Sequence, residues 1–131
     1  MIFLDTHVLV WLASDENRLS RHAASAIRRA RASGGLAIAD IVIWELAFLF
    51  ARGVLRSQHT TETTIRRLVE NTGVVVKPIT PEIASLAAHF PETYPRDPAD
   101  RLIGATALAE GLPLVTRDEG IRNSPLLRTI W

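Results

Sequence analysis

The sequence predicts an α/β fold with three layers, α/β/α, in which a short and mainly parallel central sheet lies between helices. Short apolar or β-branched runs alternate with longer stretches of helical periodicity, and glycine, proline or capping residues separate them. Strands that alternate with helices usually pair in parallel, because each helix carries the chain back across the sheet. The length of 131 residues suits one core, so we expect a single domain over residues 1–131.

The predicted strands are short runs of buried character. The first begins at Met1 and ends at an acid, and the third is β-branched and bounded by Gly73 and Pro78. The predicted strands cover residues 1–4, 36–39, 74–76, 112–116 and 126–130.

The predicted helices are marked by apolar stripes and by end signals. Ser20, Thr80 and Asp97 stand at N-cap positions, Pro81 and Pro98 follow at first helical positions, and a glycine ends several of the helices. The stretch 14–17 is a polar break, and residues 91–95 form a loop. The predicted helices cover residues 6–13, 21–32, 41–51, 60–71, 81–90 and 98–110.

Composition excludes several classes of function. Apolar residues make up 47% and charged residues 22%, and cysteine is absent, so there is neither a disulfide framework nor a thiolate zinc site. The start of the chain lacks a basic leader, and no apolar run is long enough to span a bilayer, so we expect a cytoplasmic protein with no membrane partner. The net charge of +1 alone does not indicate nucleic acid, although all basic residues except Lys77 are arginine, which suits phosphate and carboxylate partners.

Two aspartates directly follow predicted strands. Asp5 ends the first strand and Asp118 lies just beyond the fourth. In an open parallel sheet, ligands bind beyond the carboxyl ends of the strands, so both acids share one crevice if these strands are neighbours. Each aspartate is also placed to cap the turn or helix that follows it, and one residue can serve as both cap and ligand.

Glu45 is the most informative acid in the sequence. It is the only charge in the apolar stretch 41–50, where a lone carboxylate is costly unless it is paired or faces a cleft. A buried ion pair with an arginine is the structural alternative. A cation bound in a shared cleft offsets the same cost of burying the carboxylate.

Three further aspartates differ in their expected roles. Asp97 before Pro98 has a strong structural explanation as an N-cap, whereas Asp100 lies in the first turn with its side chain free to face the strand ends. We therefore prefer Asp100 as the ligand and keep Asp97 as an auxiliary residue. Asp40 is expected to cap the helix that carries Glu45.

Two threonines and the histidines complete the survey of polar residues. Thr6 and Thr116 each neighbour a proposed site acid and can orient a carboxylate or a water molecule. His7 follows Asp5 by two positions, but no second histidine stands at metal-binding spacing. The sequence therefore does not support histidine-based zinc chemistry.

The candidate site consists of Asp5, Glu45, Asp100 and Asp118. Carboxylates without histidine or cysteine suit Mg²⁺ or Mn²⁺. Such ions neutralise phosphate charge and activate water, so no protein nucleophile is required. The reaction class that follows is metal-assisted hydrolysis of a phosphodiester or a phosphomonoester.

Four motifs, in order along essentially the whole chain, resemble the PIN-domain family and within it the VapC-type toxins of toxin–antitoxin pairs. The stretches are 3–6 (Phe-Leu-Asp-Thr), 43–46 (Ile-Trp-Glu-Leu) with 51–53, 96–103 with 105–107, and 114–118 (Leu-Val-Thr-Arg-Asp).

The resemblance implies a Mg²⁺- or Mn²⁺-dependent endoribonuclease that acts as a homodimer. A cognate antitoxin protein holds such toxins inactive by laying a helix and an arginine-bearing tail into the groove. Asp5, Glu45, Asp100 and Asp118 match the family's acidic quartet, and Asp97 falls within the third motif. Asp40 departs from the pattern, because many relatives carry a small hydroxyl residue there.

Other functions remain compatible with these residues. A structure-specific DNA nuclease or a phosphatase can use the same acids, and a catalytically silent binding module uses them only as caps and ion-pair partners. The bulky residues Val10, Trp11 and 48–50 supply more apolar surface than one core needs to bury. We expect part of this surface to meet an antitoxin or a second subunit.

Overall fold

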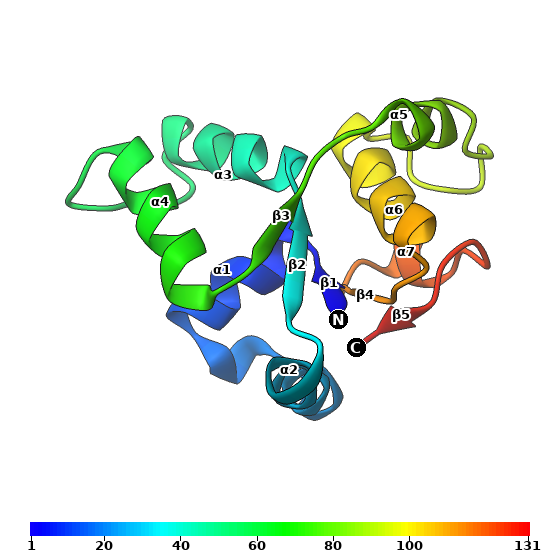
Figure 1. Cartoon of the computed structure of the whole chain (residues 1–131). Coiled ribbons are helices and arrows are strands. Elements are labelled where there is room, and N and C mark those ends of the chain that lie inside the picture. The colour runs from blue at the N-terminus through cyan, green and yellow to red at the C-terminus, as the bar shows by residue number, and fades with distance from the viewer.

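A computed structural model describes all residues 1–131, and its strands and helices alternate as the sequence predicts (Figure 1). The strands are β1 (Ile2–Leu4), β2 (Leu36–Ala39), β3 (Val75–Lys77), β4 (Leu114–Val115) and β5 (Thr129–Ile130). The helices are α1 (Thr6–Ser14), α2 (Arg21–Ser33), α3 (Ile41–Ala51), α4 (Thr61–Thr72), α5 (Pro81–Ala88), α6 (Pro98–Glu110) and α7 (Glu119–Arg122), with a 3₁₀ turn at Glu16–Arg18.

All strands form one parallel sheet in the order β3-β2-β1-β4-β5. The first strand is therefore central: Phe3 lies opposite Ala37 on one side and Leu114 on the other. This pairing confirms the predicted parallel sheet. It also brings the carboxyl ends of β1 and β4 together, which the shared crevice for Asp5 and Asp118 requires.

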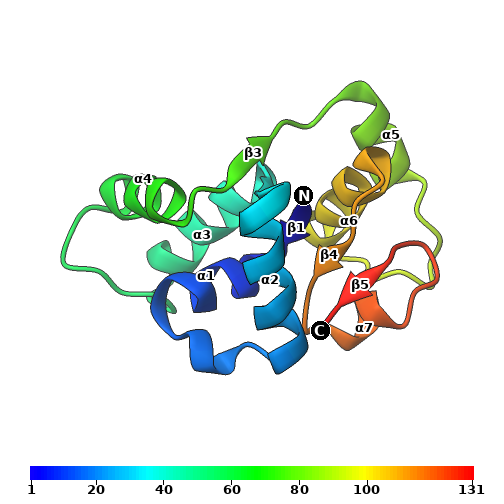
Figure 2. The same cartoon turned by 60° about the horizontal axis from the view of Figure 1, so that its bottom comes forward.

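The sheet lies between two layers of helices. In both views the strands separate α1, α2 and α4 from α5 and α6 (Figures 1 and 2). Because both faces are covered, the central strands are apolar throughout, and Phe3, Leu4, Ile38, Leu114 and Val115 are fully buried. None of the helices combines the length and apolar character needed to cross a membrane.

Most helix boundaries follow the predicted capping chemistry. The hydroxyls of Ser20 and Thr80 accept hydrogen bonds from backbone N–H groups three residues later, and Asp97 accepts one from Ala99 at 2.8 Å. Gly111, at φ 67°, ends α6 in the left-handed conformation.

Several predicted boundaries were wrong. The 112–116 and 126–130 strands shorten to two residues each, because the ladder joins only the segments that meet β1 and each other. The polar break after α1 contains a 3₁₀ turn, and the helix from Pro81 ends at Ala88. The turn that Asp118 was expected to cap is present as the short helix α7.

Arg101 joins the loop that precedes α6 to the helix itself. Its guanidinium donates hydrogen bonds to the backbone carbonyls of Phe90 (2.9 Å), Pro95 (3.1 Å) and Pro91 (3.3 Å). Tyr94 in the same loop is buried and donates its hydroxyl to the backbone carbonyl of Asp100 at 3.0 Å. These contacts fix the first turn of α6, the turn that carries Asp100.

Gly104 on α6 leaves the space that the Tyr94 ring occupies. A Cβ atom added at Gly104 would lie 2.2 Å from the Tyr94 hydroxyl oxygen and 2.8 Å from Cζ. The ring also packs edge-on against Phe90 with centroids 4.8 Å apart, so it has little room to retreat.

We expect Gly104→Ala to destabilise the protein by about 1–3 kcal/mol, because overpacking outweighs the gain in helix propensity. Urea unfolding measures this change. Adding Tyr94→Phe removes the closest contact and should restore part of the loss. A Gly104→Ala variant as stable as the wild type would contradict the close packing of Tyr94 against Gly104.

Candidate active site

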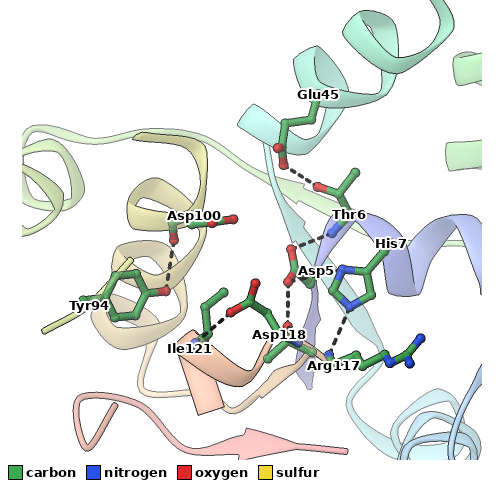
Figure 3. Close-up of polar contacts among 10 residues, drawn as sticks. Asp5, Thr6, His7, Glu45, Tyr94, Asp100, Arg117, Asp118 and Ile121 are labelled. Carbon is green, nitrogen blue, oxygen red and sulfur yellow. Dashed lines mark hydrogen bonds and ion pairs between the residues drawn. The ribbon is translucent and has the colours of Figure 1, made fainter. Parts of the chain in front are cut away.

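Asp5 forms the buried base of the site (Figure 3). One carboxylate oxygen accepts a hydrogen bond from the Thr6 backbone N–H at 2.8 Å, which caps α1. The other oxygen accepts one from the Thr116 hydroxyl at 2.6 Å. Asp5 is therefore a helix cap and a member of the acidic cleft at once.

Thr116 connects the two strand ends. Its hydroxyl donates to Asp5 and also accepts a hydrogen bond from the Asp118 backbone N–H at 3.1 Å. The residue is fully buried, so its bond to Asp5 is protected from water. Thr116 therefore orients the Asp5 carboxylate.

Asp118 caps the short helix α7, with one oxygen accepting from the Ile121 N–H at 2.9 Å. Its second oxygen makes no hydrogen bond, and the residue is exposed. Figure 3 shows its carboxylate directed toward the space beside Asp5. The capped oxygen fixes the side chain, and the other remains available to a ligand.

Glu45 reaches the same space from α3. It is half-buried and accepts a short hydrogen bond, 2.5 Å, from the Thr6 hydroxyl. No arginine or lysine forms an ion pair with it, so the buried ion-pair alternative is wrong. Burial raises the pKa of Glu45, as do the charges of Asp5 and Asp97, while the bond from Thr6 opposes the shift.

Asp100 projects from the first turn of α6 toward Asp5 and Glu45 (Figure 3). Its carboxylate makes no hydrogen bond to the protein. Burial, followed by the charges of the surrounding acids, raises the pKa of Asp100 to about 7. The acids that act on it are Asp5, Asp97, Glu45 and Asp118. Asp100 is therefore the residue whose pKa is raised by the charges of all the other predicted acids.

The two other aspartates considered in the sequence analysis lie outside this cleft or at its rim. Asp97 is exposed and caps α6 as predicted, and it borders the groove between α3 and α6. Asp40 does not cap α3, so that prediction was wrong. Its backbone is already helical, and its side chain accepts a hydrogen bond from the Ile79 N–H at 3.0 Å on the neighbouring chain segment.

His7 belongs to the site, although the sequence singled it out only by its position. Its Nε2 accepts a hydrogen bond from the Arg117 backbone N–H at 3.0 Å, which places the proton of the neutral ring on Nδ1. Nδ1 lies 3.6 Å from an oxygen of Asp5. Burial lowers the pKa of His7 and outweighs the opposing charges of Asp5 and Asp118. His7 therefore stands as a neutral ring between Asp5 and the chain after β4.

The donor chemistry of the cleft fits a hard divalent cation. Its four carboxylates supply only oxygen, and their mutual repulsion is the condition that a cation relieves. As the side chains lie, no three of them are arranged to hold one ion together. The Asp100 carboxylate makes no hydrogen bond and is free to turn toward a ligand, whereas Asp118 is held by its cap on α7 and offers its second oxygen in place.

Comparisons with known proteins identify the family and the fold. The family model described as PIN domain matches residues 2–125. Ribonuclease VapC22 of Mycobacterium tuberculosis (strain ATCC 25618 / H37Rv) is 37% identical over 132 residues, covering 99% of this chain and 98% of that protein.

Solved structures share the fold at low sequence identity. The crystal structure of VapBC2 from Rickettsia felis, bound to a DNA fragment from its promoter, superposes with a TM-score of 0.73 at 16% identity, covering 98% of this chain and 97% of that one. A toxin–antitoxin complex from Klebsiella pneumoniae has a TM-score of 0.66 at 21% identity, with 96% and 94% covered.

Proposed function

We infer that this chain, which belongs to the PIN domain family, is a metal-dependent endoribonuclease and the toxin of a toxin–antitoxin pair. The observation that carries the proposal is the convergence of Asp5, Glu45, Asp100 and Asp118, from distant parts of the sequence, on one cleft at the carboxyl edge of the sheet. The ribonuclease activity named for the M. tuberculosis relative supports RNA as the substrate.

Asp5, Glu45, Asp100 and Asp118 would hold Mg²⁺ or Mn²⁺. When bound, the ion neutralises phosphate charge and lowers the pKa of water. Thr116 fixes Asp5, and Thr6 fixes one oxygen of Glu45, leaving its other oxygen to orient the attacking water. Asp118 is held by its cap to α7, so these three acids are held by the protein before substrate arrives, while Asp100, whose carboxylate makes no hydrogen bond, turns to complete the set.

The activity is tested by incubating the protein with an RNA, a single-stranded DNA of the same sequence and a flap DNA. We expect Mg²⁺ or Mn²⁺ to support cleavage of RNA, at least about a hundredfold faster than of either DNA, and EDTA to stop it. Preferred cleavage of flap DNA would instead identify a structure-specific DNA nuclease. Release of phosphate from monoesters alone would identify a phosphatase.

We expect Thr116→Val to lower RNA cleavage roughly 10- to 100-fold, because Asp5 and the Asp118 backbone lose their shared hydroxyl. Thr116→Ser keeps the hydroxyl and should retain most of the activity. Initial rates over a range of Mn²⁺ concentrations measure both variants. Equal rates in Thr116→Val and the wild type would show that Thr116 has no role in holding the acids.

We also propose that the antitoxin covers the apolar groove between α3 and α6. The groove has a volume of about 510 Å³, and Trp44 and Phe48 on its wall stack at 5.2 Å while remaining 57% and 42% exposed. Glu45 and Asp97 also line it, so an occupant with an arginine reaches the acids directly. Trp11, which we expected to belong to such a surface, is buried beneath other side chains.

This partner proposal is tested with the product of a small reading frame next to the gene. Trp44→Ala should weaken the complex at least about tenfold in a titration. Trp44→Phe keeps an aromatic ring and should bind nearly normally. Light scattering tests the proposed homodimer, and a strict monomer at high concentration would contradict it.

A further inference from the structure

A second pocket adjoins the acidic cleft on the side away from α6. We call it the basic-aromatic pocket. It has a volume of about 410 Å³, within the range of small-ligand sites. Asp118 and His7 border both this pocket and the acidic cleft, so one ligand can occupy both spaces. The lining residues of the pocket are His7, Trp11, Arg117, Asp118, Glu119, Arg122 and Trp131.

The aromatic wall of this pocket is built around Trp11. The ring of Trp131 lies 5.9 Å from it at a tilt of 52°, and the ring of His7 lies 5.0 Å away. The guanidinium of Arg18 lies 4.6 Å from the centre of the Trp11 ring. Trp11 is thus fixed by its neighbours, while the half-buried Trp131 presents its aromatic surface to the pocket.

The arginines of this pocket form no ion pair, although two acids, Asp118 and Glu119, share the lining with them and the Arg117 guanidinium lies 5.9 Å from the centre of the Trp11 ring. The guanidinium groups of Arg117 and Arg122 are exposed and make neither a hydrogen bond nor an ion pair. Figure 3 shows the Arg117 side chain directed away from the acids, past His7. The one further acid in the lining, Glu119, is exposed and likewise unpaired.

We propose that the basic-aromatic pocket binds the nucleotide that adjoins the cleaved phosphodiester in a single-stranded RNA. This inference rests on the proposed ribonuclease function. The base stacks on Trp131 beside Trp11, and the phosphate lies on Arg117 and Arg122. Aromatic rings bind unpaired bases irrespective of sequence, and arginine forks match phosphate oxygens. Because Asp118 borders both spaces, the next phosphate along the chain reaches the acids.

The test measures affinity without cleavage. A fluorescent single-stranded oligoribonucleotide is titrated in EDTA, and anisotropy is recorded at several salt concentrations. We expect Arg117→Gln with Arg122→Gln to weaken binding roughly tenfold and to reduce the slope of log affinity against log salt by about one for each arginine. Trp131→Ala should weaken binding roughly tenfold through lost stacking.

Arg28→Gln on α2 is the matched control, because Arg28 is exposed, unpaired and outside the pocket. It should retain wild-type affinity. A second readout uses Trp44→Phe, in which Trp11 and Trp131 are the remaining tryptophans, and RNA should quench their fluorescence. Urea unfolding identifies a variant that fails to fold. Arg117→Gln keeps the backbone N–H that binds His7, so it tests the pocket even if Trp131→Ala unfolds.

The results separate this inference from the proposed function. Wild-type affinity and salt dependence in folded Arg117→Gln/Arg122→Gln, or an equal loss in Arg28→Gln, would overturn the pocket while RNA cleavage by the wild type still stands. Binding that depends on Arg117 and Arg122 in a protein that cleaves no RNA would retain the pocket and reject the ribonuclease.

Discussion

Asp5→Asn is expected to reduce metal-dependent RNA cleavage by more than about a hundredfold without unfolding the protein. The asparagine oxygen can still accept from the Thr6 N–H. The new amide N–H can donate to the Thr116 hydroxyl oxygen. That oxygen then accepts two hydrogen bonds, one from the amide at position 5 and one from the Asp118 backbone N–H. The structure therefore tolerates the amide, while the cleft loses a buried negative charge. Cleavage rates and a thermal melt measure the two effects separately.

Asp15→Asn is the matched control. Asp15 lies at the other end of α1, is exposed, and makes no side-chain hydrogen bond. It should cleave RNA at the wild-type rate. Undiminished cleavage by folded Asp5→Asn would remove Asp5 from the active site and, with it, the proposed arrangement of the acids.

Asp100→Asn is expected to have opposite effects on activity and on stability. Cleavage should fall by more than about a hundredfold, because the cleft loses the carboxylate whose pKa is raised by the charges of the other acids. The metal-free protein should melt a few degrees higher at pH 8, because the variant no longer buries a carboxylate among like charges.

The pH dependence follows from the raised pKa. Asp100 titrates near pH 7 in the folded protein and near 3.8 when unfolded, so its ionisation opposes folding increasingly as the pH rises between these values. Below pH 3.8 both states are protonated, and the difference between wild type and variant should vanish. Thermal unfolding in EDTA from about pH 3 to pH 8 measures this trend.

Glu110→Gln at the far end of α6 serves as the control, since its carboxylate is exposed and contacts only Lys77 at 4.0 Å. Its melting temperature should stay close to that of the wild type across the same pH range. Added Mg²⁺ should stabilise the wild type more than Asp100→Asn at pH 8. A variant no more stable than the wild type at pH 8 would contradict the crowding of acids around Asp100.

The order of strands and helices was predictable from the sequence because local signals agree with the fold. Apolar runs buried on both faces, N-cap residues and the left-handed Gly111 mark most element boundaries. The predicted ranges for β4 and β5 were too long, because apolar residues continue beyond the residues that pair in the sheet. Pairing depends on neighbours distant in sequence, which local pattern does not contain.

The clustering of the candidate acids was more predictable than the contacts that hold them in place. Glu45 stood out because an isolated charge in an apolar helix needs an explanation, and strand-terminal aspartates indicate a crevice. The roles of His7, Tyr94 and Arg101 depend on contacts with backbone groups remote in sequence. Asp40 was misassigned for a related reason, since its hydrogen bond goes to Ile79 rather than to the start of α3.

The central position of β1 links the active site to the order in which the chain is synthesised. β1 is synthesised before the other strands of this sheet, although it lies in the middle of it, and β4 joins it only after residues 114–115 have been made. Until then Asp5 and Glu45 lack Asp118 and the buried Thr116 that holds Asp5 in place. A chain synthesised only as far as α6 therefore lacks the assembled acidic cleft, which forms once residues 114–118 lie beside β1.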